Sequence, residues 1–266
     1  NLSDLDINYA TLELKKLDKK FENFKKIQNV FLHCYYNSSN TNKLFTELSS
    51  NNEINFSRYN YFYASYIASS GNVSEAKKII KSALKIYPRN LLLNQYKIDL
   101  NEKKNINEFN CKKSNHVIAE ILYITANALS SQSVYTLSNF YLNLAKFLNK
   151  DFYSYDSLLA ENFYKTDNFE NAKKIYKDLR KRGEAFKWFS TKQLARILIQ
   201  EEKNEEAIKL TDSVYKSLIN KEIYETFDFA EFLKNNEKFK EAIVHYTNVL
   251  NNIKNDHPLY PEAKDG

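Results

Sequence analysis

The hydrophobic and polar positions between Ser154 and Leu250 repeat one pattern three times. Each copy has a helix-like run of apolar positions containing a small residue, a short polar break, and a second helix-like run that opens near an alanine. Equivalent small residues lie 35 positions apart: Ala160, Ala195 and Ala230 in the first runs, and Ala172, Ala207 and Ala242 in the second. A fixed period of this size predicts a protein built from repeated helix pairs.

The same pattern extends toward the N-terminus in two further units. They are residues 116–150, with small residues Ala126 and Ser138, and residues 58–90, with Ala64 and Ala76. Gly71-Asn72 is the expected turn inside the earlier unit, and Ser74 is the expected cap of its second helix. Small residues at the crossing would let two antiparallel helices approach closely, while large residues one turn away fill the grooves around them.

Residues 91–115 interrupt the period, since Ala76 and Ser138 are 62 positions apart and not about 34. We expect a short inserted helix in LLLNQYKIDL and then a polar linker, NEKKNINEFNCKKSN, from an insertion or an eroded half-repeat. Residues 1–57 are expected to form divergent helical repeats, with one apolar stripe through Leu14, Leu17, Phe21 and Phe24.

The last region, residues 116–266, is expected to end on a truncated unit, because the tail after Asn255 starts a first helix and then stops. On that interpretation Tyr246 and Val249 are left as an apolar packing face. The chain begins at Asn1 and contains no Met, so we also expect it to be a piece of a longer protein.

The unit at 58–90 resembles a tetratricopeptide repeat. Ala64 and Ile67 match the small and large positions of the first helix, and Ala76, Ala83 and Pro88 match the second helix and its terminating proline. Asn60 stands where the family has its early tryptophan. The resemblance implies an all-α fold, an α-solenoid of stacked antiparallel helix pairs in one continuous right-handed superhelix. The loose repeats resemble those of alphaproteobacterial envelope and assembly proteins, which implies a bacterial source.

Composition agrees with helices, because the chain has only 3 Gly and 3 Pro. A net charge of +6, spread as lysine pairs on helix faces, favours solvated surfaces over a nucleic-acid stripe. No apolar run approaches the roughly 20 residues that span a bilayer. We expect a soluble protein and leave the cytoplasm and the periplasm open. Cys34 and Cys111 have no metal or redox spacing and are expected to be buried free thiols.

Motifs for catalysis, cofactors or metals are missing from the sequence. It contains no glycine-rich phosphate loop and no HExxH, and its four histidines have no ligand spacing. We therefore expect no enzyme, no cofactor and no metal site.

The resemblance implies instead that the first helices line a concave groove for a peptide or partner protein. Tyrosines and cations there would suit a partly acidic peptide. In the family's register the groove candidates are Arg58, Tyr61, Tyr123, Asn127, Glu161, Tyr164, Lys192, Arg196, Phe227, Glu231 and Lys234. Two alternatives stay open: the non-catalytic part of a larger enzyme, such as a glycosyltransferase, and a structural scaffold that binds through its convex face.

Overall fold

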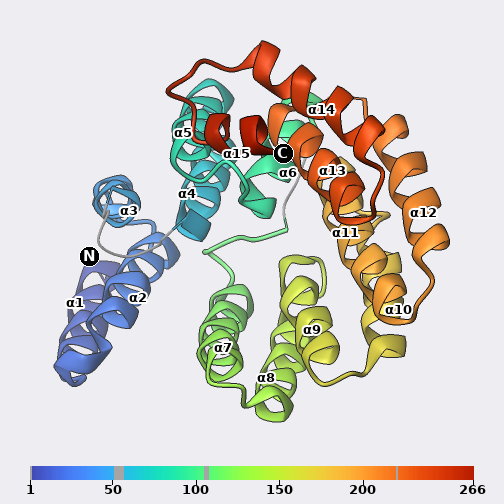
Figure 1. Cartoon of the computed structure of the whole chain (residues 1–266). Helices are drawn as coiled ribbons and strands as arrows, with labels where there is room; N and C mark the ends of the chain where they lie inside the picture. Colours follow the sequence, from blue (N-terminus) through green and yellow to red (C-terminus); the bar gives the residue numbers. More distant parts are fainter. Residues whose placement is uncertain (1, 51–56, 105–107, 220) are drawn as a thin grey trace. The chain divides into compact units, whose positions relative to one another are not determined.

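The computed structural model describes residues 2–50, 57–104, 108–219 and 221–266. These residues form α helices joined by turns, with one short 3₁₀ helix at Lys19–Phe21 and no strand among them (Figure 1). The predicted all-α class is confirmed. Within the described residues, no helix combines the length and the apolar character that a bilayer crossing needs.

The chain divides into two compact units, Asn1–Asn162 and Phe163–Gly266, which we call unit 1 and unit 2 and describe separately. Unit 1 contains α1 Leu2–Lys15, α2 Glu22–Tyr35, α3 Thr41–Ser49, α4 Ser57–Ser69, α5 Val73–Ile86, α6 Leu91–Asn101, α7 Ser114–Ser131, α8 Tyr135–Leu148 and most of α9 Ser154–Lys165. Unit 2 contains the end of α9, then α10 Phe169–Leu179, α11 Glu184–Gln200, α12 Asn204–Ser217, α13 Ile223–Asn235, α14 Phe239–Asn252 and α15 Tyr260–Asp265. That all repeats form one continuous superhelix stays a prediction.

Four of the predicted helix pairs each lie within one unit and are present, and the small residues of all five predicted pairs are buried. The pairs α4–α5, α7–α8, α11–α12 and α13–α14 pack against each other. The ten small residues of the five units are all at most 1% exposed. In the α7–α8 pair the two small positions touch, because the Ser138 hydroxyl donates to the Ala126 carbonyl at 2.8 Å. Close approach at these positions is the geometry that the period predicted.

The turns inside the pairs repeat as regularly as the helices. One residue in each has a left-handed backbone, with φ between 56° and 89°: Gly71, Ser133, Asp167, Glu202 and Glu237. The N–H of the residue that follows donates to the carbonyl of a large residue five positions earlier, at 2.8–3.2 Å: Ile67, Leu129, Phe163, Leu198 and Leu233. This bond closes the end of the first helix and satisfies one of its orphan carbonyls. Asn72, and not Ser74, caps α5, since the Asn72 side chain accepts the N–H of Glu75.

The N-terminal region differs from the expected continuous apolar stripe. The first helix ends at Lys15 and the second begins at Glu22, so Leu14 and Phe24 lie on different helices. Leu17 and Phe21 lie in the connection between them and are 39% and 46% exposed. The short helix α3 follows. Residues 51–56 of the expected 1–57 region lie outside the described residues.

The expected polar linker is partly core. Phe109 is buried and packs its ring 4.2 Å from that of Phe62, with Phe31 and Phe152 also in contact with it. Cys111 follows and is disulfide-bonded to Cys34 of α2, with the Cα atoms 5.8 Å apart. The prediction of two free thiols was wrong. Residues 105–107 of this stretch lie outside the described residues.

The apolar residues Tyr246 and Val249 near the end of unit 2 are covered. Tyr246 and Val249 are buried at 3% and 0% exposure and are not an open packing face. Leu259 and Ala263, from α15 and the residue before it, belong to the same core cluster. The tail therefore forms a short closing helix that packs on α14.

Candidate functional site

Arg58, the first groove candidate, is an interior ion-pair partner. Its Nε and Nη2 atoms donate to the two carboxylate oxygens of Glu120 at 2.7 and 2.9 Å, and Nη1 donates to the Ser154 hydroxyl at 2.6 Å. The side chain of Glu120 is fully buried and that of Arg58 is 15% exposed. Burial alone would lower the pKa of Arg58, but the Glu120 carboxylate raises it. The three residues join α4, α7 and α9 inside unit 1.

Tyr123 and Asn127 of α7 have different surroundings. The Arg58 guanidinium lies 3.9 Å from the centre of the Tyr123 ring, which makes Tyr123 part of the same packed arrangement. Burial raises the pKa of Tyr123. Asn127 lies one turn further along α7 and is exposed. Glu161 of α9 is partly exposed.

Tyr61 and Phe227 were assigned to the groove from the family's register, and that assignment was wrong. Tyr61 is 1% exposed and stacks against Phe152 at 5.7 Å between ring centres. Phe227 is 3% exposed and packs edge-on to Tyr246. Both side chains fill the core, so neither can offer a surface to a partner.

The other predicted residues of unit 2 gather on one partly exposed face. We call this the α11–α13 face and define it as Tyr164, Lys192, Arg196, Asp228, Glu231 and Lys234. Lys192 and Arg196 are four residues apart on α11 and therefore share one side of that helix. Asp228 and Glu231 are three residues apart on α13. The Lys192 ammonium and the Asp228 carboxylate form an ion pair that joins the two helices.

Aromatic rings flank the charges of this face. The Arg196 guanidinium lies 3.7 Å from the centre of the Tyr164 ring, a cation–π contact. Glu231 accepts a hydrogen bond from the Tyr246 hydroxyl and lies 3.5 Å from the Lys234 ammonium. Burial, and then the bond to Glu231, raise the pKa of Tyr246. The face thus presents three cations, two carboxylates and a tyrosine ring.

Asp228 belongs to this face although the sequence analysis did not select it. The family's register pointed to Phe227, one position earlier. One residue corresponds to about 100° of rotation around a helix, which separates the core side from the outer side. Asp228 lies four residues after Tyr224 and three before Glu231, and this spacing is the signal that could have identified it.

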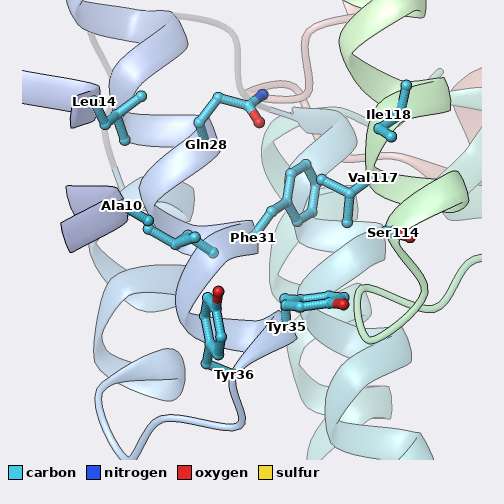
Figure 2. Close-up of a pocket in the computed structure, with 10 residues that line it drawn as sticks. Ala10, Leu14, Gln28, Phe31, Tyr35, Tyr36, Ser114, Val117 and Ile118 are labelled. Carbon is cyan, nitrogen blue, oxygen red and sulfur yellow. The ribbon is translucent and has the colours of Figure 1, made fainter. Parts of the chain in front are cut away.

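Unit 1 contains a largely apolar pocket of about 380 Å³, which the sequence analysis did not anticipate. Figure 2 shows it between Ala10 and Leu14 of α1, Phe31 and Tyr35 of α2 with Tyr36 just after that helix, and the start of α7 with Val117 and Ile118. The Gln28 Nε2 atom in its wall is buried and makes no hydrogen bond. Cys34 directly precedes the lining residue Tyr35, and Cys111 lies three residues before the lining residue Ser114. The disulfide between them therefore links α2 to the segment that leads into α7.

The side chains of the α11–α13 face can form ion pairs, cation–π contacts and hydrogen bonds. Among the described residues there is no group of three or more His, Cys, Asp or Glu side chains that could hold a metal.

No protein-family model matches this sequence, and no curated protein matches it significantly. Solved structures do show similarity. A tetratricopeptide repeat protein from Parabacteroides merdae aligns over 100% of this chain and 98% of its own, with 11% identity and a TM-score of 0.42. TPR-like repeats of a candidate kinesin light chain from Podosopora anserina align over 72% of this chain and 92% of their own, with 13% identity and a TM-score of 0.37.

Proposed function

We propose that this chain is a non-catalytic protein-interaction module, and that its α11–α13 face binds an acidic segment of a partner protein. The observation that carries the proposal is the cluster of partly exposed cations on this face: Lys192, Arg196 and Lys234, with side chains of Lys192 and Lys234 about one-third exposed at 34% and 36%. These cations lie on the helices α11 and α13.

The binding step is an exchange of partners. A carboxylate of the incoming segment would compete with Asp228 for Lys192, and a second one would reach the outer edge of the Arg196 guanidinium while its face stays on Tyr164. Arginine held flat by a ring is well placed for two parallel hydrogen bonds to a carboxylate. Because the exchange takes Lys192 away from Asp228, the loss of that ion pair offsets part of the gain. Affinity would then be moderate and would fall with added salt.

The experiment is capture of partners from cell extract by the protein and by Lys192→Glu with Arg196→Glu. The matched control is Lys174→Glu with Lys209→Glu, which makes the same change in charge at exposed positions of α10 and α12. We expect the first variant to lose a partner that the control keeps. If both variants keep every partner of the unchanged protein, the α11–α13 face is not the binding surface.

A second candidate, a structural scaffold that binds through its second helices, has an observation in its favour. The outer side of α8 carries four large apolar residues at spacings of three and four, each between 38% and 84% exposed: Leu137, Phe140, Leu144 and Phe147. An exposed stripe of this kind marks an interaction surface. Phe140→Ser with Phe147→Ser would remove partners under this candidate and keep them under the first one.

The disulfide bears on the compartment. Disulfides persist in oxidising surroundings and are rare in a reducing cytosol. We therefore favour an oxidising compartment such as the periplasm over the cytoplasm. Trapping of free thiols in freshly lysed cells tests this, since Cys34 and Cys111 should resist alkylation there until a reductant is added.

A further inference from the structure

Among the described residues of unit 1, the helix α6 is not followed by the second helix that would complete a helix pair. In the regular units a first helix is followed by a second helix after a tight turn. The α6 helix packs on α4 and α5 as the next first helix would. After it, residues 102–104 and 108–113 form turns and extended chain up to α7, with no helix among them. The sides of α5 and α6 that a second helix would cover therefore have no partner helix from the segment that follows.

A pocket of about 360 Å³ lies between α5 and α6. Apolar side chains line it, with Ile80 and Leu84 from α5 and Leu100 from α6. Three lysines also line it: Lys77 and Lys81, which are exposed and one turn apart on α5, and Lys97 on α6. No acidic residue is among the lining residues. The pocket is thus apolar inside and cationic around its edge.

We propose that this pocket docks an acidic amphipathic helix from a partner protein, which takes the place of the absent second helix. One apolar side chain of that helix would enter between Ile80, Leu84 and Leu100. Acidic residues three or four positions away would lie beside it on the same helix face and meet the lysines.

Two features of the site determine the chemistry of this partner. A helix fits because α5 and α6 pack against each other, and in a helical repeat a further helix packs into the groove between two such neighbours. Acidic flanks fit because the exposed residues Lys77 and Lys81 line the pocket, so an incoming basic helix would be repelled. This surface belongs to unit 1 and is independent of the α11–α13 face proposed above.

The test uses the full chain and a synthetic, end-blocked helical peptide of about 15 residues, with leucines on one stripe and glutamates flanking it. Fluorescence anisotropy of the labelled peptide measures binding. We expect Lys77→Glu with Lys81→Glu to weaken binding at least about tenfold, since two attractions become repulsions. Leu84→Trp fills the pocket and should weaken binding by a similar factor. The control Lys85→Glu with Lys112→Glu, at exposed positions outside the lining, should bind within about twofold of the unchanged protein.

Several results would overturn the proposal. One is equal weakening by the Lys77/Lys81 variant and by the control, which would show only long-range attraction. Another is equal binding of a peptide with lysines in place of its glutamates. A third is unchanged binding by Leu84→Trp with a normal melting temperature, which would place the apolar anchor elsewhere. Dodecanoate that binds this pocket when the peptide does not would identify a small anionic amphiphile as the ligand instead.

Discussion

The guanidinium of Arg58 and the carboxylate of Glu120 form a two-pronged ion pair inside unit 1, with nitrogen–oxygen distances of 2.7 and 2.9 Å. The two residues are 62 positions apart in the chain and lie on α4 and α7. The pair therefore connects helices on both sides of the interrupted period. Burial raises the pKa of Glu120, and the adjacent Arg58 opposes that shift.

Removing one partner of this pair should be strongly destabilising. Glu120→Gln or Arg58→Met leaves a buried charge without its counterpart, which costs about 3–5 kcal/mol in the free energy of unfolding. Urea denaturation followed by circular dichroism measures the loss. The double variant Arg58→Met with Glu120→Leu should recover part of it, because two apolar side chains then replace two charges. A single variant as stable as the unchanged protein would contradict the buried pair.

The left-handed turn residues predict that two substitutions change the stability of the protein in opposite directions. Gly71 has φ +89°, and a Cβ added there would meet nothing within 4 Å, so Gly71→Ala acts through backbone strain alone. It should lower stability by about 1 kcal/mol. Glu202→Gly, at a turn with φ 62°, should raise stability by up to about 1 kcal/mol because it relieves the same strain. Changes of the same sign in both variants would show that the two turns are not equivalent.

This turn geometry illustrates what the sequence could predict. The period fixes the small residues at the helix crossings and the large residues before each turn, and both are local features. The left-handed backbone follows at the same place even where the residue is Ser133, Asp167 or Glu202, because the packing of the two helices selects the conformation. The fold class and the positions of these turns could therefore be predicted from the sequence.

The site was predictable only in part, because its features depend on long-range contacts. In the sequence Arg58 resembles a groove cation, because its contact with Glu120 forms only in the folded chain. Cys34 and Cys111 are 77 positions apart, and nothing local signals their pairing. Phe227 and Asp228 are neighbours in the chain but face opposite environments, so an error of one position in the register exchanged a core residue for a surface one.

The disulfide should contribute substantially to the stability of unit 1. Closing a loop of this length restricts the unfolded chain, and loss of such a link typically costs about 2–5 kcal/mol. Cys34→Ala should therefore melt at a lower temperature than the unchanged protein without reductant. A reducing agent should lower the melting temperature of the unchanged protein and leave that of the variant where it is. A melting temperature that does not respond to reduction would contradict the link.

His116 should make unit 1 sensitive to mild acid. Burial lowers its pKa, and Lys113 adds to that effect while Asp151 opposes it. The Nδ1 atom accepts the backbone N–H of Asn110 at 3.1 Å, a bond that requires this nitrogen to be unprotonated. Below a pH of about 6.5 the unfolded histidine binds a proton before the folded one does, so the free energy of unfolding falls as the pH falls.

The measurement is the unfolding midpoint in urea from pH 7.5 to pH 5. His116→Asn keeps an acceptor near the Nδ1 position but does not titrate, so its midpoint should fall less over this range. His33 and His245 also have pKa values lowered by burial, and they contribute to the dependence that remains. A variant with the same pH dependence as the unchanged protein would exclude His116 as a contributor.

The central claim, that the α11–α13 face binds a partner protein, is tested most directly by site-specific photo-crosslinking in living cells. A benzophenone amino acid is placed at Ile199 of α11 or at Asn235 of α13, exposed positions one turn from Arg196 and Glu231, so that the cations of the face stay in place. Phe147 on α8 is the comparison position. The account predicts that the same partner is crosslinked from both positions beside the face and not from Phe147. A partner that is crosslinked from Phe147 and from neither position beside the face would contradict it.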